Sequence, residues 1–425
     1  MDIQLDLASG PRQRNFLDYL NSALRARMPS HSGTAGGSPD GTFFSQVTGS
    51  FPIDQGHVEL TWRLQKNADG TLTSLSVEAT GGGVSPQSWQ TAAYEFATSV
   101  LSATLAEKRQ RFYRRSFFFY IGPQLDGEYW LPGYRFAPAF PADPAPHQIN
   151  AERVVSIDQN IGAIDDMHSF ALAEESSRRH AARLSLLLNV GLYRQEHSMR
   201  WVLPTTDGQP ASQSVRCHLM FHHPDIALAA VPEKGTACSL GSYTGSLAAR
   251  YRVAGELQSL PREARKILRG VDRANPIVAD AFDRGARLYQ VASVCGHLFP
   301  SVGLAYRVAA VEAISGADKT CNGFSEFMRK YITSRTDIDS ILAYLYGYAR
   351  SGHFHGGVFP MGEFTRVGHF DPLMDMDSVE RDSVHRACYE LTREAIVNCM
   401  QSVVPPEPDG EESDQPESDD VRGHA

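Results

Sequence analysis

The C-terminal half of the chain constrains the fold most strongly, because its apolar residues recur at helical spacing in one segment after another. One segment begins directly after Asn275 with a proline, a residue favoured in the first helical turn. The last segment opens with the letters DSVE, an acid-x-x-Glu capping pattern. Four amphipathic helices in succession favour an all-α four-helix bundle. We predict them near residues 276–298, 303–315, 337–351 and 377–403.

The N-terminal half mixes strand and helix patterns. Apolar and polar residues alternate through 57–65 and again through 71–79, on either side of the turn letters NADG, which predicts a β-hairpin. Helical spacing follows at 85–111 and at 165–193, and the apolar run 116–122 is typical of a buried strand. These patterns indicate an α+β domain.

The predicted organisation is therefore an α+β domain over residues 1–235, of no recognisable family, and a helical domain over 245–403. We place the boundary within 231–245, and interpret the Gly-, Ser- and Pro-rich stretch 29–41 as a linker. The tail 404–425 is acidic and free of aromatic residues, so we expect it to be disordered.

Charge does not exclude a nucleic-acid partner. The formal net charge is −9, but the tail holds eight acids and one base, so residues 1–403 carry only −2 and local basic patches retain their effect.

The six cysteines form no CxxC pair, which argues against a zinc knuckle or a disulfide framework. We find neither a signal-peptide pattern nor an apolar run long enough to span a membrane, and expect a cytoplasmic protein without a cofactor.

The letters RSGHFHGG place Arg350 and His355 at the end of the third predicted helix. We expect Gly352 to end that helix, and Gly356 and Gly357 to let the chain turn away. The arrangement is an Arg-x4-His motif at a helix end. Taken alone, the motif is also explained as cationic side chains placed at a helix C-terminus, where positive charge is favourable.

The motif and its context resemble the HEPN family, and within it the Apea-like branch. The resemblance covers about 276–403 and rests on RSGHFHGG, on AYRVAAVEAISG, on the lead-in ILAYLYGYARS and on the order of the helices. The chain departs from the family pattern at Ser351, where an amide or acid is frequent, and in the twenty or so residues that separate His355 from the last helix.

This resemblance implies a HEPN-like four-helix bundle with a metal-independent endoribonuclease site, formed where two protomers pair. Arg350 and His355 would be catalytic, with Tyr346, Ser351 and His353 in support. It implies RNA and a second copy of the chain as partners, a role in phage defence or as a toxin, and an unidentified protein or phage trigger. The alternative is a non-catalytic, HEPN-like scaffold for dimerisation or nucleotide binding.

Glu312 supports the same site indirectly. Leu304, Val308 and Glu312 share one face of the second predicted helix, which places a carboxylate on an apolar stripe. An unpaired charge there is costly. We therefore predict that the Glu312 carboxylate lies within hydrogen-bond reach of Arg350 or Tyr346.

Two further segments carry candidate ligand-binding residues. The letters EKRQRFYRR interleave bases with aromatic rings, as in surfaces that grip single-stranded RNA, although a solvated helix end explains them equally. In RCHLMFHH, expected within a strand at 214–223, His218 and His222 would lie about 13 Å apart at ~3.3 Å per residue, too far to chelate one ion, so we predict no metal site. The bases proposed to bind RNA are Lys108, Arg109, Arg111, Arg114 and Arg115.

Overall fold

The structure, a computed structural model, divides into two compact units. The first comprises residues 1–114 and 160–174, and the second comprises 115–159 and 175–425. The predicted domain boundary, His218, His222, Lys108 and all of the tail beyond residue 405 lie outside the residues that the structure describes. The described residues are 1–3, 11–38, 41–54, 56–68, 71–80, 84–107, 109–139, 152–194, 199–202, 213–216, 225–228, 230, 257–336, 338–364 and 376–405.

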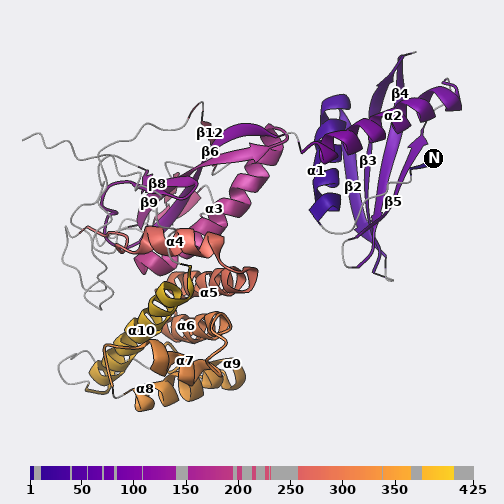
Figure 1. Ribbon diagram of the computed structural model, residues 1–425. Coiled ribbons are helices and arrows are strands. Elements are labelled where there is room, and N and C mark those ends of the chain that lie inside the picture. The colour runs from indigo at the N-terminus through magenta and orange to yellow at the C-terminus, as the bar shows by residue number, and fades with distance from the viewer. Residues whose placement is uncertain are drawn as a thin grey trace, which may run out of the picture. The chain divides into compact units, whose positions relative to one another are not determined.

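An antiparallel sheet of order β1-β5-β4-β3-β2 forms the first unit, with two helices against one face (Figure 1). The helices are α1 (Pro11–Arg27) and α2 (Pro86–Leu105). The predicted hairpin is confirmed as β4–β5, and the alternating residues Val58, Leu60 and Trp62 of β4 are buried in the core. The strands are β1 (Asp2–Ile3), β2 (His31–Gly37), β3 (Phe43–Ile53), β4 (Gly56–Lys66) and β5 (Leu72–Ala79).

The prediction of a linker over 29–41 was wrong, because β2 lies within it. β2 is the edge strand and pairs with β3 along its whole length. Gly36 lies opposite Phe44, and a Cβ added at Gly36 would come within 2.8 Å of the Phe44 ring. Glycine is therefore needed here so that an aromatic side chain can lie over the edge strand.

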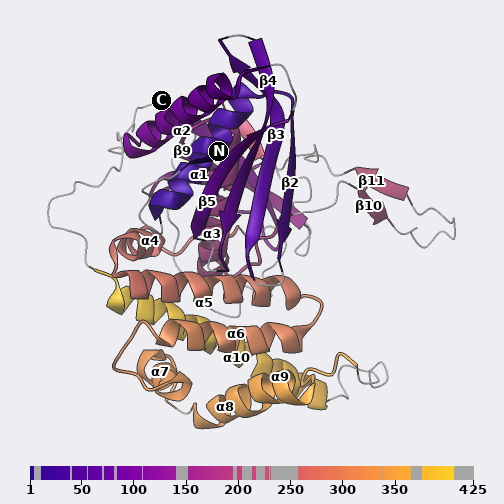
Figure 2. The same ribbon diagram turned by 90° about the vertical axis from the view of Figure 1, so that its right-hand side faces the viewer.

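The second sheet has the order β12-β6-β9-β8-β7, and its strands β6 and β9 and the helix α3 (Asp166–Leu188) contribute residues to both units. The predicted helix 85–111 ends early, at Leu105, and the bases that follow lie on β6 instead. α3 also ends before the predicted residue 193, because Asn189 adopts a left-handed φ of 59°. The strands are β6 (Gln110–Ile121), β7 (Tyr129–Leu131), β8 (Tyr134–Pro138), β9 (Glu152–Ala163) and β12 (Asp225–Leu228), with a separate hairpin of β10 (Met199–Val202) and β11 (Gln213–Arg216) (Figure 2).

A row of charged side chains crosses this second sheet. Asp158 on β9 is directly opposite Arg135 on β8, and Arg135 Nη1 donates to Asp158 Oδ2 at 2.9 Å. Arg115 on β6 approaches the same carboxylate from the other side, with Nε 2.6 Å from Oδ1 and Nη2 2.8 Å from Oδ2. Arg135 also donates from Nε to Glu128 Oε2 at 2.5 Å. The Asp158 side chain is 2% exposed and that of Arg115 is 28% exposed, so this ion-pair network is buried at its central carboxylate and reaches solvent at Arg115.

A C-terminal helical region completes the second unit (Figure 2). The four predicted helices are present, and α6 lies at their centre, in contact with α5, η2 and α10. α5 and α6 approach closely because Gly285 lacks a side chain, since a Cβ there would lie 2.2 Å from Ile314. The helices are α4 (Ala264–Arg273), α5 (Pro276–Cys295), α6 (Pro300–Ser315), α7 (Phe324–Tyr331), α8 (Asp339–Ala343), η2 (Tyr344–Gly352), α9 (His353–Gly356) and α10 (Met376–Val403).

The third predicted helix does not end at Gly352, which corrects the expectation from the sequence. The chain passes from α8 into a π-helical stretch, η2, and continues without a break into α9. Gly352 has an ordinary helical φ of −60°, whereas Gly357 has a φ of +63° and ends the helix. His355 is therefore on the helix rather than beyond it. Among the described residues, no helix is long and apolar enough to cross a membrane.

Asp318, just after α6, has a carboxylate that accepts several hydrogen bonds. Its Oδ1 accepts from the Thr320 hydroxyl at 2.7 Å, and its Oδ2 accepts from Lys330 Nζ at 2.5 Å and from the Tyr331 hydroxyl at 2.7 Å. Burial acts to raise the Asp318 pKa, but these hydrogen bonds outweigh it and hold the pKa below the ordinary value of 3.8.

We predict that Asp318→Asn destabilises the protein by ~2 kcal/mol at neutral pH, because the charged hydrogen bonds are lost. The folded pKa lies below the unfolded one, so the carboxylate stabilises the fold fully above 3.8 and progressively less as the pH falls below that value. Urea unfolding of both proteins near neutral pH and in acid measures this. A difference in unfolding free energy that persisted undiminished in acid would contradict the prediction.

Candidate functional site

Arg350 lies near the end of η2, where it contacts α6 through a single carboxylate. Its Nε donates to Glu312 Oε2 at 3.3 Å, and its guanidinium lies 5.7 Å from the centroid of the Tyr346 ring. The prediction that Glu312 reaches Arg350 is confirmed. The Arg350 side chain makes no other hydrogen bond within the described part of the chain. Its orientation is therefore set through Nε, while both terminal nitrogens, Nη1 and Nη2, can still donate to another group.

The pair is less buried than the apolar stripe suggested, because the side chains of Arg350 and Glu312 are 29% and 27% exposed. We therefore predict that Glu312→Ala lowers the free energy of unfolding by only about 0.5–1 kcal/mol, rather than the ~3–5 kcal/mol of a fully buried pair. Chemical denaturation of the variant, beside Glu312→Gln, measures this. A loss of several kcal/mol would contradict a mainly orienting role for Glu312.

His355 lies on α9, one turn beyond Arg350, with its imidazole exposed. It makes no hydrogen bond or ion pair with any described residue. His353 differs, because it is half-buried, its Nδ1 donates to the Val358 carbonyl at 3.1 Å, and its ring packs edge-on against Phe359. His353 therefore fixes the turn after α9 through its bond to the Val358 carbonyl, whereas the imidazole of His355 is available for proton transfer. Ser351, also half-buried, follows Arg350 directly.

The segment after α9 is fixed against the start of α6. The Glu363 carboxylate accepts from the Ser301 backbone N–H at 2.6 Å and from the Ser301 hydroxyl at 2.7 Å. It thereby satisfies a free donor in the first turn of α6. The same hydroxyl accepts from the Met361 N–H at 2.9 Å. These bonds give the turn at Gly357 a fixed position next to His355.

Three exposed aromatic rings lie on the same helical segments as Arg350 and His355. Tyr346, Tyr348 and Phe354 are all exposed on η2 and α9. The Phe354 ring packs edge-on against Tyr306 of α6, with centroids 5.7 Å apart. Exposed rings beside a guanidinium and an imidazole are suited to stacking nucleobases while the cation contacts phosphate.

The basic residues around 108–115 divide into two kinds. Arg109 and Arg111 are exposed, and Arg109 makes only long hydrogen bonds to Asn15 and Gly162, of 3.4 and 3.5 Å. Arg114 is 2% exposed, donates to Ser169 at 2.8 Å and pairs with Asp166. Arg115 is bonded to Asp158, and that hydrogen bond raises its pKa. Arg114 and Arg115 are therefore engaged inside the fold, and Arg109 and Arg111 remain exposed.

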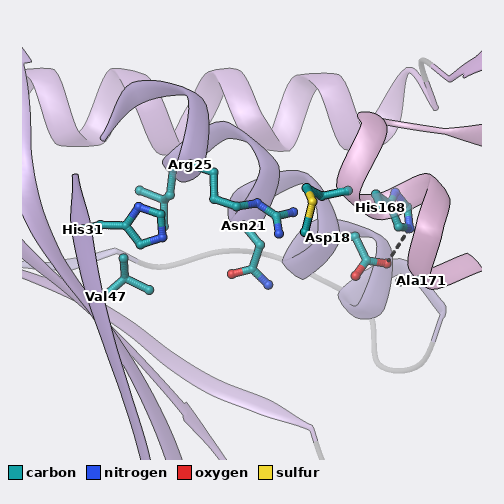
Figure 3. A pocket seen from close by; sticks show the side chains of 9 residues that line it. Asp18, Asn21, Arg25, His31, Val47, His168 and Ala171 are labelled. Carbon is teal, nitrogen blue, oxygen red and sulfur yellow. Dashed lines mark ion pairs between the residues drawn. The ribbon is translucent and has the colours of Figure 1, made fainter. Parts of the chain in front are cut away.

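A pocket in the first unit escaped the sequence analysis. It measures about 330 Å³ and lies between α1, the β2–β3 edge of the sheet and the start of α3 (Figure 3). Asp18, Asn21 and Arg25 share one face of α1, at positions i, i+3 and i+7, and that polar face was the only signal in the sequence. His31 and His168 join them from segments more than a hundred residues apart.

Asp18 and His168 lie next to each other in this pocket (Figure 3). His168 Nδ1 accepts from the Ile164 N–H at 3.4 Å, so in the neutral ring the proton is on Nε2, which lies 3.7 Å from Asp18 Oδ2. Burial raises the Asp18 pKa, against the opposing effect of His168, Arg14, Arg109 and Lys66. Among the described residues, no three ligating side chains gather closely enough to hold a metal ion.

Comparisons with protein-family models, with curated proteins and with solved structures find no match to this chain. The chemistry of its sites therefore has to be argued from the geometry of its own residues.

Proposed function

We propose that residues 276–403 form a HEPN-like four-helix bundle, and that Arg350 and His355 cleave RNA without a metal ion where two copies of the chain pair. The orientation of Arg350 supports this proposal most directly. Glu312 engages only Nε, at 3.3 Å, which leaves the two terminal nitrogens to donate together. A guanidinium in this state offers a fixed fork of donors to phosphate oxygens.

The reaction is an internal transfer. The ribose 2′-oxygen attacks the adjacent phosphorus, a base removes its proton, the P–O5′ bond breaks, and an acid protonates the departing 5′-oxygen. Imidazole performs both proton transfers near neutral pH. One His355 can act as base and the His355 of a second copy as acid, while Arg350 stabilises the charged phosphorane. The exposed rings of Tyr346, Tyr348 and Phe354 support binding of the flanking bases.

The test is cleavage of total RNA by the full-length protein in EDTA, with Arg350→Lys as the comparison. We expect products with 2′,3′-cyclic phosphate ends, formed at a rate that falls on dilution below the dimer constant. Arg350→Lys should be at least tenfold slower, because an ammonium group lacks the planar fork. Arg329→Lys is the matched control, since Arg329 is also a helical arginine paired with a single carboxylate, that of the exposed Asp339.

Equal cleavage by wild type and Arg350→Lys would refute the role of Arg350. Absence of cleavage by a protein that still dimerises would instead favour the scaffold alternative. If cleavage is found, a role in phage defence and the identity of a trigger would next be tested in cells.

A further inference from the structure

We infer that the pocket of the first unit binds a guanosine monophosphate. This site is separate from Arg350 and His355, and the inference does not depend on RNA cleavage. At about 330 Å³ the pocket lies at the small end of the range for small-molecule sites, roughly 300–1,000 Å³. Figure 3 shows Arg25 and Asn21 between His31 at one end and the Asp18–His168 pair at the other.

An anionic group is favoured at Arg25. Its guanidinium makes no hydrogen bond with any described residue, and its ion pair with Asp165 Oδ2 is long, at 3.6 Å. The other oxygen of that carboxylate, Oδ1, is bonded to the His168 N–H at 2.6 Å. The fork of Arg25 therefore lacks a well-placed acceptor, and phosphate supplies one with matching geometry.

Further cations lie near the pocket. Asp18 is subject to the electrostatic attraction of Arg14, Lys66 and Arg109 in addition to His168. His31 lies on the Arg25 side, where its Nδ1 donates to the Met28 carbonyl at 2.7 Å, so in the neutral ring Nε2 can accept a hydrogen bond from a ligand hydroxyl. These cations add a long-range attraction for phosphate-bearing molecules, whereas Arg25 is the cation in the lining that would contact the phosphate.

The opposite end of the pocket selects a base with donor groups. An ionised carboxylate only accepts hydrogen bonds, so Asp18 requires N–H or O–H groups on the ligand. Guanine presents two N–H donors on one edge, whereas adenine presents one donor beside an acceptor nitrogen. Leu24, Val47 and Met167 provide apolar walls for the flat face of the base. Asp18 and Arg25 are about 10 Å apart along α1, at 1.5 Å per residue, which suits the distance from base edge to phosphate in a mononucleotide.

Isothermal titration of the full chain with guanosine monophosphate, guanosine and adenosine monophosphate tests the inference. We expect saturable binding of guanosine monophosphate, and at least tenfold weaker binding of the other two. Arg25→Gln should weaken guanosine monophosphate at least tenfold and leave guanosine unchanged. Asp18→Asn should weaken both. Arg27→Gln, two residues along α1 with its guanidinium 5.5 Å from the Phe51 ring, is the matched control and should change neither.

Circular dichroism of each variant establishes that it is folded, and Arg25→Gln keeps the inference testable if Asp18→Asn does not fold. Three outcomes would overturn it. They are the absence of a saturable heat at millimolar guanosine monophosphate, equal affinity for adenosine monophosphate, and equal weakening by Arg27→Gln and Arg25→Gln.

Discussion

Alanine at His355 is expected to slow RNA cleavage by roughly 10²–10⁴-fold, the usual cost of losing general acid–base catalysis. RNA binding should change little, because His355 is exposed, makes no hydrogen bond to the described chain, and acts mainly in the transition state. Its removal should also leave stability unchanged for the same reason. Single-turnover cleavage and filter binding on the same RNA separate the two effects.

The matched control is His57→Ala, which removes an exposed imidazole from β4 of the first unit. A more discriminating comparison uses mixed dimers. If each copy supplies one imidazole to the shared phosphate, a dimer of one wild-type and one His355→Ala chain should be nearly as slow as the double variant at any site that needs both. Cleavage by His355→Ala at the wild-type rate would refute the ribonuclease proposal and leave the scaffold reading of the motif.

The contact at this site was predictable because one carboxylate breaks an apolar stripe. Leu304 and Val308 are fully buried on α6, and the residue one turn further on is Glu312. A carboxylate in that position needs a cationic partner, and Arg350 is the cation of the Arg-x4-His motif. The exposed fraction of the Glu312–Arg350 pair was not predictable, because it depends on how far η2 extends over α6.

The helix end was mispredicted for a related reason. A glycine in a helical pattern predicts a break, but a Cβ at Gly352 would meet only ordinary contacts, and its φ of −60° is helical. What distinguishes Gly357 is a φ of +63°, which the sequence does not reveal. The π-helical stretch before it was equally invisible, since wide turns of this kind arise from packing and are frequent at functional sites.

Elements that carry their own pattern were recovered, whereas the pocket of the first unit, assembled from distant segments, was not. The β4–β5 hairpin follows from alternation on either side of a turn, and α5 begins where Asn275 and Pro276 predict. The pocket of the first unit joins α1 to the start of α3, more than a hundred residues away. Only the tertiary fold brings His168 to Asp18, and no local spacing signals it.

Asp158→Ala is the second substitution for which we expect a large effect, in this case on stability. Asp158 is the only carboxylate that joins Arg115 to Arg135 among the described contacts of the second sheet, and it is 2% exposed. Its removal leaves two guanidinium groups with a lost partner inside a strand ladder. Truncating one member of a buried ion pair costs about 3–5 kcal/mol. We expect the lower end of that range here, because Arg135 keeps its bond to Glu128 and Arg115 is 28% exposed.

Hydrogen exchange of peptides within residues 115–159 measures this loss locally, so the behaviour of the first unit does not enter. We expect amides of β6, β8 and β9 to exchange about a hundredfold faster or more, since each 1.4 kcal/mol is a factor of ten in the opening equilibrium. Asp339→Ala is the control, because its pair with Arg329 at 2.9 Å is exposed on both sides and should be worth at most about 1 kcal/mol. Asp158→Asn should fall between them, since the amide oxygen can still accept one of the hydrogen bonds. Equal exchange in Asp158→Ala and Asp339→Ala would mean that water replaces the carboxylate at no cost, and the row across the sheet would then be a surface feature rather than part of the core.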